Sequence, residues 1–136
     1  MTAHRFELRV YYEDTDLAGI VYYANYLKFI ERARTEALLA AGIDQVALER
    51  ELGSVFAVRA LSVDYRAPAR FQDVLTVRTT VAAVTAARAR LIQEVWRADE
   101  LLVAAEVDVV CLGRDGRPRR LPEPVRAALG GMLPGP

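Results

Sequence analysis

One segment of this sequence repeats its apolar residues with helical spacing, and most of the remainder repeats them with strand spacing. Near the N-terminus apolar side chains recur at steps of three and four over about twenty residues, and Gly42 follows as a stop signal. These residues are Tyr23, Tyr26, Leu27, Ile30, Ala33, Ala37, Leu38 and Ala41. From Val55 to Leu112 apolar and polar residues largely alternate, as they do in half-buried strands. This order of elements predicts an α+β fold with one long helix on an antiparallel sheet.

Turn-forming residues divide the rest of the chain. We expect strands at 6–11, 61–65, 75–81, 91–98 and 101–112, with a surface loop at 67–73. Asp44 is a favourable N-cap for a short helix over 44–50, Asp99-Glu100 predicts a tight strand connection, and Asp115-Gly116 predicts a turn after the last strand. A helix ending at residue 129 would complete a single domain over 1–129, and the segment 130–136 is expected to be disordered.

Composition excludes several kinds of catalytic site. His4 is the only histidine and Cys111 the only cysteine, so a Ser-His-Asp or Cys-His apparatus, a His-rich zinc site and an internal disulfide have no residues to be built from. We therefore expect no metal and a cytoplasmic location. The formal net charge is zero, and no apolar run reaches the length of a bilayer, so neither nucleic-acid binding nor a membrane span is expected.

The densest group of chemically active side chains precedes the long helix. Glu13, Asp14 and Asp16 fall within four residues, and Gly19 separates them from the helix. The spaced oxygen ligands and closing glutamate of a calcium loop are missing. A carboxylate beside the free N–H groups of a helix N-terminus is instead the minimal equipment for attacking a carbonyl.

The same segment carries a long family motif. The matching residues are Tyr12-x-Asp14-Thr15-Asp16-x-x-Gly19-Ile20-Val21-Tyr22-Tyr23-x-Asn25-Tyr26, then Phe29, Glu31, Arg32, Ala33 and Arg34, with shorter matches at Val63-x-Tyr65 and Pro68-Ala69-x-Phe71-x-Asp73. In these residues the chain resembles the hotdog-fold acyl-CoA thioesterases, specifically the 4-hydroxybenzoyl-CoA thioesterase group that includes the Tol-Pal-associated YbgC-like enzymes. The resemblance implies about five antiparallel strands wrapped around one long helix. It also implies homodimers that pair into homotetramers, with active sites at the dimer interface.

The resemblance also assigns roles to residues. Asp16 aligns with the catalytic aspartate, which acts either as the nucleophile or as the general base for a water. The backbone N–H of Tyr23 would polarise the thioester carbonyl, and Gly19 would let the backbone approach the substrate. Many YbgC-like members carry histidine where this chain has Tyr23, so a link to the Tol-Pal system and a preference for short aliphatic acyl groups do not follow.

Other residues are expected to support this site. Asp14, Thr15 and Asn25 would hydrogen-bond the turn and hold Asp16. The phosphates of coenzyme A call for basic side chains, for which the candidates are Arg66, Arg70, Arg88 and Arg90.

The expected function is hydrolysis of an acyl-CoA thioester to a free acid and CoA, with no cofactor because CoA is part of the substrate. Two alternatives stay open at this point. One is a thioesterase acting on acyl groups carried by a protein pantetheine, and the other is a non-catalytic protein that binds acyl-CoA.

Overall fold

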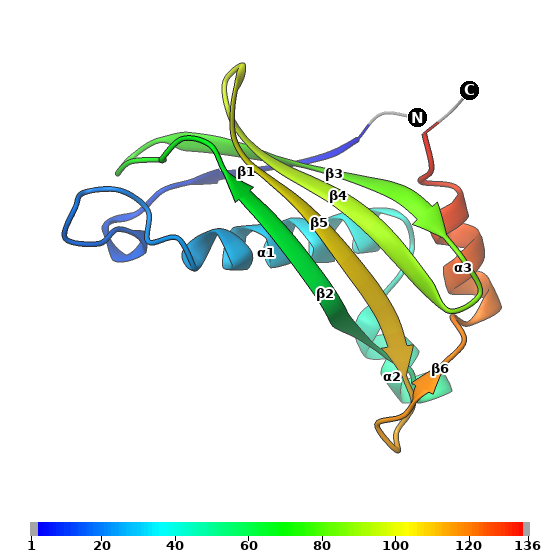
Figure 1. Cartoon of the computed structure of the whole chain (residues 1–136). Coiled ribbons are helices and arrows are strands. Elements are labelled where there is room, and N and C mark those ends of the chain that lie inside the picture. Colours follow the sequence, from blue (N-terminus) through cyan, green and yellow to red (C-terminus); the bar gives the residue numbers. More distant parts are fainter. Residues whose placement is uncertain (1–2, 135–136) are drawn as a thin grey trace.

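The computed structural model describes residues 3–134 as one curved antiparallel sheet with a long helix in its hollow (Figure 1). The strands are β1 (His4–Arg9), β2 (Val55–Tyr65), β3 (Val74–Val84), β4 (Arg88–Arg97), β5 (Glu100–Leu112) and β6 (Pro118–Arg119). The helices are α1 (Asn25–Ala40), α2 (Gln45–Leu52) and α3 (Glu123–Gly130), and the 3-10 turn η1 covers Tyr12–Asp14. This is the expected hotdog arrangement, in which a sheet of five long strands wraps one central helix.

The strand order explains which parts of the sheet are covered. The order is β1-β3-β4-β5-β2, and β6 pairs with β5. Helix α1 packs on β1, β3 and β4. Strand β2 forms an edge, because it pairs with β5 on one side only. Its exposed apolar side chains include Val58, Leu61 and Tyr65.

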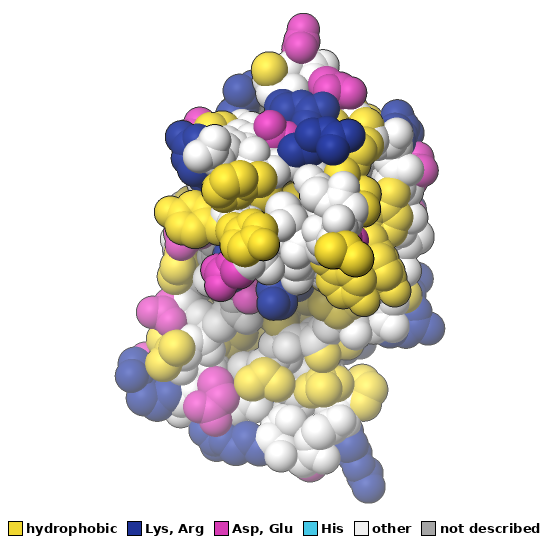
Figure 2. All heavy atoms as spheres, turned by 90° about the vertical axis from the view of Figure 1, so that its left-hand side faces the viewer, with side chains coloured by type: hydrophobic (Ala, Val, Ile, Leu, Met, Phe, Trp, Pro, Cys, Tyr) yellow, Lys and Arg dark blue, Asp and Glu magenta, His cyan; other side chains and the backbone are white. Residues whose placement is uncertain are grey.

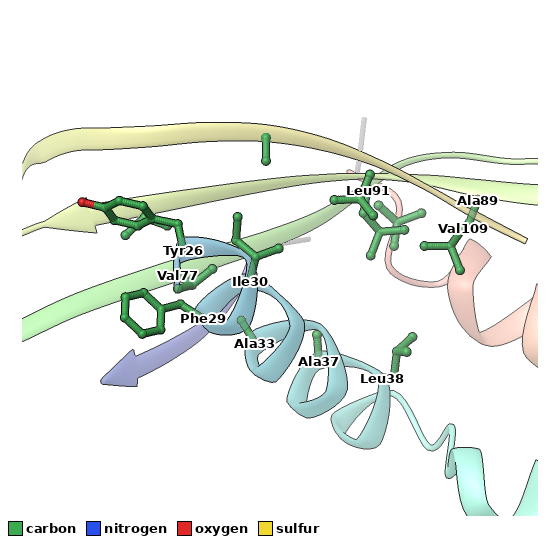
Figure 3. Packing of buried hydrophobic residues seen from close by; sticks show 14 of the residues in the cluster. Tyr26, Phe29, Ile30, Ala33, Ala37, Leu38, Val77, Ala89, Leu91 and Val109 are labelled. Carbon is green, nitrogen blue, oxygen red and sulfur yellow. The ribbon is translucent and has the colours of Figure 1, made fainter. Parts of the chain in front are cut away.

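The core lies between α1 and the inner face of the sheet. One face of α1 buries Tyr26, Phe29, Ile30, Ala33, Ala37 and Leu38. In Figure 3 these side chains face Val77, Leu91, Ala89 and Val109 of the sheet. The alternating burial of β3 and β4 is the period of two that the sequence shows, so binary patterning selects the inner face.

A buried polar group interrupts this apolar core. The Gln93 side chain is fully buried, and its amide nitrogen donates to the Ile30 carbonyl and to the Thr79 hydroxyl, each at 2.9 Å. Its amide oxygen accepts from Arg34 of α1 at 3.0 Å. One side chain of β4 therefore joins α1, β3 and β4.

The structure corrects several expected boundaries. Helix α1 begins at Asn25 rather than Tyr23, because the Leu27 N–H donates to the Ala24 carbonyl and leaves the Tyr23 carbonyl without a helical bond. Strand β1 ends at Arg9, since Val10 bonds instead to residues 72 and 73. The turn between β4 and β5 is Ala98-Asp99, with Ala98 at φ 52°, rather than Asp99-Glu100.

The C-terminal segment also differs from expectation. Helix α3 continues to Gly130, and Met132 is buried against the core, so disorder from residue 130 is wrong for the segment through Met132. Met132 follows the end of α3 by only two residues, so its apolar side chain can pack against the core. Residues 135–136 lie outside the described residues.

Candidate active site

The acidic segment forms a tight turn that presents Asp16 at its start. Thr15 and Val21 pair as an isolated antiparallel bridge. Within it the Asp16 N–H donates to the Ile20 carbonyl at 3.0 Å, and the Gly19 N–H donates to the Asp16 carbonyl at 2.9 Å. Gly19 has φ 79°, a left-handed conformation that side-chain-bearing residues rarely adopt. This backbone conformation by itself favours glycine at position 19.

The Asp16 carboxylate is exposed, and one oxygen is held by the turn. Its Oδ1 accepts from the Ala18 N–H at 2.9 Å. Among residues 3–134 nothing donates to the second oxygen, Oδ2. The carboxylate is thus oriented by one bond and keeps one oxygen for a reaction.

Asp14, Thr15 and Asn25 brace this turn without touching the Asp16 carboxylate. The Asp14 carboxylate accepts from the Tyr11 N–H at 2.8 Å, and its carbonyl accepts from the Tyr22 N–H at 3.0 Å and from the Asn25 side chain at 2.9 Å. The Thr15 hydroxyl donates to the Tyr12 carbonyl at 2.7 Å. The main chain on either side of Asp16 is therefore fixed to the start of α1.

The start of α1 offers free donors. Its N-cap is Ala24, whose side chain caps nothing. In the part of the chain that the structure describes, the N–H groups of Tyr23 and Ala24 donate to no protein acceptor. The first turn of the helix carries no acidic side chain, so the positive end of the helix dipole is uncompensated there. Such a terminus binds a carbonyl oxygen or an anion.

The loop Ala67–Asp73 holds the turn and the helix together. The Val21 N–H donates to the Ala69 carbonyl at 2.9 Å, and Ile20 pairs with Arg70. The Ala69 N–H donates to the Tyr26 hydroxyl at 2.9 Å. Ala69 is fully buried, whereas most of the other residues in 67–73 are exposed, so the loop lies at the surface as expected and Ala69 anchors it.

Tyrosine rings surround the helix start. The rings of Tyr22 and Tyr23 meet edge to face, as do those of Tyr23 and Tyr65, and Tyr65 also lies against Tyr26. The Tyr65 hydroxyl donates to the Tyr23 carbonyl at 3.1 Å, and burial, followed by the neighbouring Tyr23, raises the pKa of Tyr65. Figure 2 shows apolar side chains gathered on this end of the molecule, where Tyr12, Leu17 and Phe71 are also exposed.

The structure separates the four candidate arginines into two pairs. Arg70 lies beside the turn through its bridge to Ile20, and Arg66 follows β2 and pairs with Asp64 at 2.9 Å. Arg88 and Arg90 lie at the N-terminal end of β4, where they pair with Val110 and Asp108 of β5. Strand β2 runs between these ends, and the eight residue-to-residue steps from Ala57 to Tyr65 span about 26 Å. Arg88 and Arg90 therefore lie far from Asp16 of the same chain.

Arg88 belongs to a basic surface cavity of about 950 Å³ that the sequence did not reveal. Its arginines are Arg59, Arg88, Arg119 and Arg120, over an apolar floor that includes Val110 and Leu112. Arg59 and Arg88 share the carboxylate of Asp108, at 3.2 and 3.3 Å. Arg59 occupies a bulge where the β2–β5 register shifts, and no periodic pattern marks such a position.

Two kinds of feature are absent from the residues that the structure describes. Across residues 3–134 no group of three or more His, Cys, Asp or Glu side chains is arranged to hold a metal ion. In the same range no helix is long and apolar enough to cross a membrane.

Comparison with known proteins gives consistent matches. Residues 18–104 match the family model of the thioesterase superfamily. The acyl-CoA thioester hydrolase YbgC of Escherichia coli O6:H1 is 42% identical over 128 residues, which cover 93% of this chain and 95% of the relative.

Two solved structures share the fold over most of their length. A probable thioesterase from Bartonella henselae has a TM-score of 0.85 and 35% identity, covering 88% of this chain and 99% of that one. A 1,4-dihydroxy-2-naphthoyl-CoA thioesterase from Synechocystis has a TM-score of 0.86 and 27% identity, covering 94% of this chain and 96% of that one.

Proposed function

The chain belongs to the thioesterase superfamily and is an acyl-CoA thioester hydrolase, in which we propose that Asp16 attacks or activates water at the thioester carbonyl. The observation that carries this assignment is one braced unit. The proposal is supported by the exposed Asp16 carboxylate, which has one oxygen without a protein donor, and by the backbone bond that ties its turn to Tyr22, beside the acceptor-free N–H groups before α1. The match to the family model begins at residue 18, so the role of Asp16 rests on this geometry and on the motif.

The Tyr23 N–H would bind the thioester oxygen, and the dipole of α1 would add to its effect. In the nucleophilic route the free Asp16 oxygen bonds to the carbonyl carbon, the C–S bond breaks, and the CoA thiolate leaves. Water then hydrolyses the resulting anhydride and restores the carboxylate. In the general-base route Asp16 takes a proton from the attacking water and passes it to the departing thiolate. Both routes place negative charge on the same oxygen, where each preorganised donor is worth about a hundredfold or more in rate.

A homodimer through β2 would complete the site. Strand β2 has an unpaired edge with exposed Val58, Leu61 and Tyr65, and such edges pair readily. Two β2 strands related by a two-fold axis run antiparallel, so the Val55 end of one lies against the Tyr65 end of the other. The basic cavity of one copy would then adjoin the Asp16 turn of the second. We expect two such dimers to pair into a homotetramer, and light scattering tests this by measuring the molar mass in solution.

In this dimer the candidate arginines of two copies would line one CoA-binding site. The cavity arginines Arg59, Arg88, Arg119 and Arg120 of one copy, with Arg90 beside them, would hold the CoA phosphates. Arg70 of the other copy lies beside its own Asp16 turn and would meet the pantetheine arm. Arg66 lies outside the basic cavity, pairs with Asp64, and has the weakest claim.

The reaction needs no cofactor in this scheme, because CoA is carried by the substrate. A cytoplasmic location is supported by Cys111, a sole and fully buried thiol. Fractionation of cells producing the protein tests that placement.

A thiol-release assay tests the function. Wild-type protein is given a panel of aliphatic, aromatic and hydroxylated aromatic acyl-CoAs, together with the same acyl groups on a carrier-protein pantetheine. We expect turnover on free CoA thioesters, with the preferred acyl group read from kcat/KM. Turnover only on carrier thioesters would favour the carrier-protein alternative. Binding without turnover on any of them would favour the non-catalytic one.

A further inference from the structure

The hydrogen bond from Tyr65 to the Tyr23 carbonyl joins two segments that are far apart in sequence. Tyr65 ends the edge strand β2, and its hydroxyl oxygen lies 3.1 Å from the Tyr23 carbonyl oxygen. Its ring lies 6.0 Å from the Tyr23 ring and 5.7 Å from the Tyr26 ring, between centroids. The ring packing sets the position of the hydroxyl, and the hydroxyl sets the position of the carbonyl.

The Tyr23 carbonyl needs this donor because the helix does not supply one. In a regular helix the N–H of Leu27 would bond to Tyr23, four residues earlier. Here the Leu27 N–H donates to the Ala24 carbonyl at 3.1 Å, and α1 begins only at Asn25. Within residues 3–134 no group other than the Tyr65 hydroxyl donates to the Tyr23 carbonyl.

Fixing this carbonyl also fixes the donors of the proposed site. The Tyr23 carbonyl and the Ala24 N–H belong to one planar peptide unit, so their directions change together. Holding that unit also limits rotation about Tyr23, whose own N–H is the other acceptor-free donor. A carbonyl that accepts a hydrogen bond polarises its peptide and strengthens the N–H at the other end as a donor.

We infer that Tyr65 is a positioning residue, which sets the Tyr23–Ala24 peptide so that the N–H groups at the start of α1 bind the thioester oxygen. This inference rests on the proposed function and adds a role that the acidic turn does not contain. Tyr65 acts from the edge strand, through the backbone, without contacting the reacting atoms.

The test is Tyr65→Phe, which keeps the packed ring and removes only the hydroxyl. On the acyl-CoA that the wild type hydrolyses fastest, kcat/KM should fall about tenfold. Tyr12→Phe is the matched control, because Tyr12 is exposed and its hydroxyl bonds to nothing in residues 3–134. It should behave as the wild type.

Two inert analogues of the same acyl-CoA separate positioning from packing. One is a ketone with a methylene in place of sulfur, which keeps the carbonyl oxygen, and the other is a thioether, which lacks it. Tyr65→Phe should weaken binding of the ketone about tenfold and leave the thioether unchanged. Equal weakening of both analogues, or a kcat/KM within about twofold of wild type, would overturn the inference. Absence of turnover in the wild type would instead overturn the proposed function.

Discussion

At the scale of single residues, Asp73 stabilises, through hydrogen bonds, the loop 67–73 that packs against the acidic turn. Its carboxylate accepts from the Arg70 N–H at 2.8 Å and from the Arg97 guanidinium at 2.7 Å. Arg97 in turn donates to the Pro68 carbonyl and pairs with Glu100. Burial alone would raise the pKa of Asp73, but the Arg70 N–H and the Arg97 guanidinium outweigh it, and the pKa is lowered.

This lowered pKa predicts how stability depends on pH. A carboxyl whose pKa is lower in the folded state than in the unfolded chain stabilises the fold above its ordinary pKa of 3.8, and this contribution is lost as pH falls through the folded value. Asp73→Asn should therefore lower the melting temperature at pH 6, and the difference from wild type should shrink below about pH 4. Thermal melts followed by circular dichroism across this range check it, and a difference independent of pH would contradict it.

At the scale of elements, the sequence predicts what periodicity controls and misses what long-range contacts control. The long helix, the strands from β2 to β5 and the Asp44 cap, which accepts from the Val46 N–H at 2.9 Å, follow from local pattern. The start of α1 does not, because the Tyr23 carbonyl accepts its hydrogen bond from Tyr65, which is 42 residues away, instead of from the helix. Likewise the family resemblance assigns roles to Asp16 and Tyr23, whereas Tyr65 gains a role only where the end of β2 meets the residues just before α1.

The attachment of α1 to the sheet gives a second prediction. Replacing Gln93 with Leu removes the amide nitrogen that donates to the Ile30 carbonyl and to the Thr79 hydroxyl. It also removes the amide oxygen that accepts from Arg34, so the half-buried Arg34 guanidinium loses its hydrogen-bond partner. Burial already lowers the pKa of Arg34. We expect Gln93→Leu to destabilise the fold by about 2–4 kcal/mol in urea unfolding.

The double variant Arg34→Leu/Gln93→Leu is the matched control. Because it removes both partners rather than one, it should be more stable than Gln93→Leu alone. If the two substitutions were simply additive, the network would not be a coupled unit.

At the scale of the whole molecule, the parts of the proposed site are divided between two ends of the sheet. The acidic turn lies at one end of the sheet, and the cavity with Arg59, Arg88, Arg119 and Arg120 lies at the other. No sequence window contains this division, since the four arginines come from β2, β4 and the segment around β6. Pairing of β2 edges is the one step that would bring the two ends together.

A mixing experiment tests that step. Asp16→Asn lacks the carboxylate, and the double variant Arg88→Gln/Arg120→Gln should show a KM raised about tenfold. In a mixed dimer one site would combine the intact Asp16 of one copy with the intact arginines of the other. Co-expression should therefore restore low-KM turnover to about a quarter of the wild-type level. Mixtures with no more low-KM activity than the separate variants would show that each site lies within one chain.

Of the three carboxylates in the acidic turn, we propose that only Asp16 takes part in thioester hydrolysis. The direct measurement is the rate of CoA thiol release by Asp16→Asn beside Glu13→Gln, with both folds verified by circular dichroism. Glu13 is exposed and bonds to no side chain in residues 3–134, so its variant should match the wild type. For Asp16→Asn we predict a kcat at least about a thousandfold lower with acyl-CoA binding retained. Turnover by Asp16→Asn within about tenfold of the wild type would contradict the account.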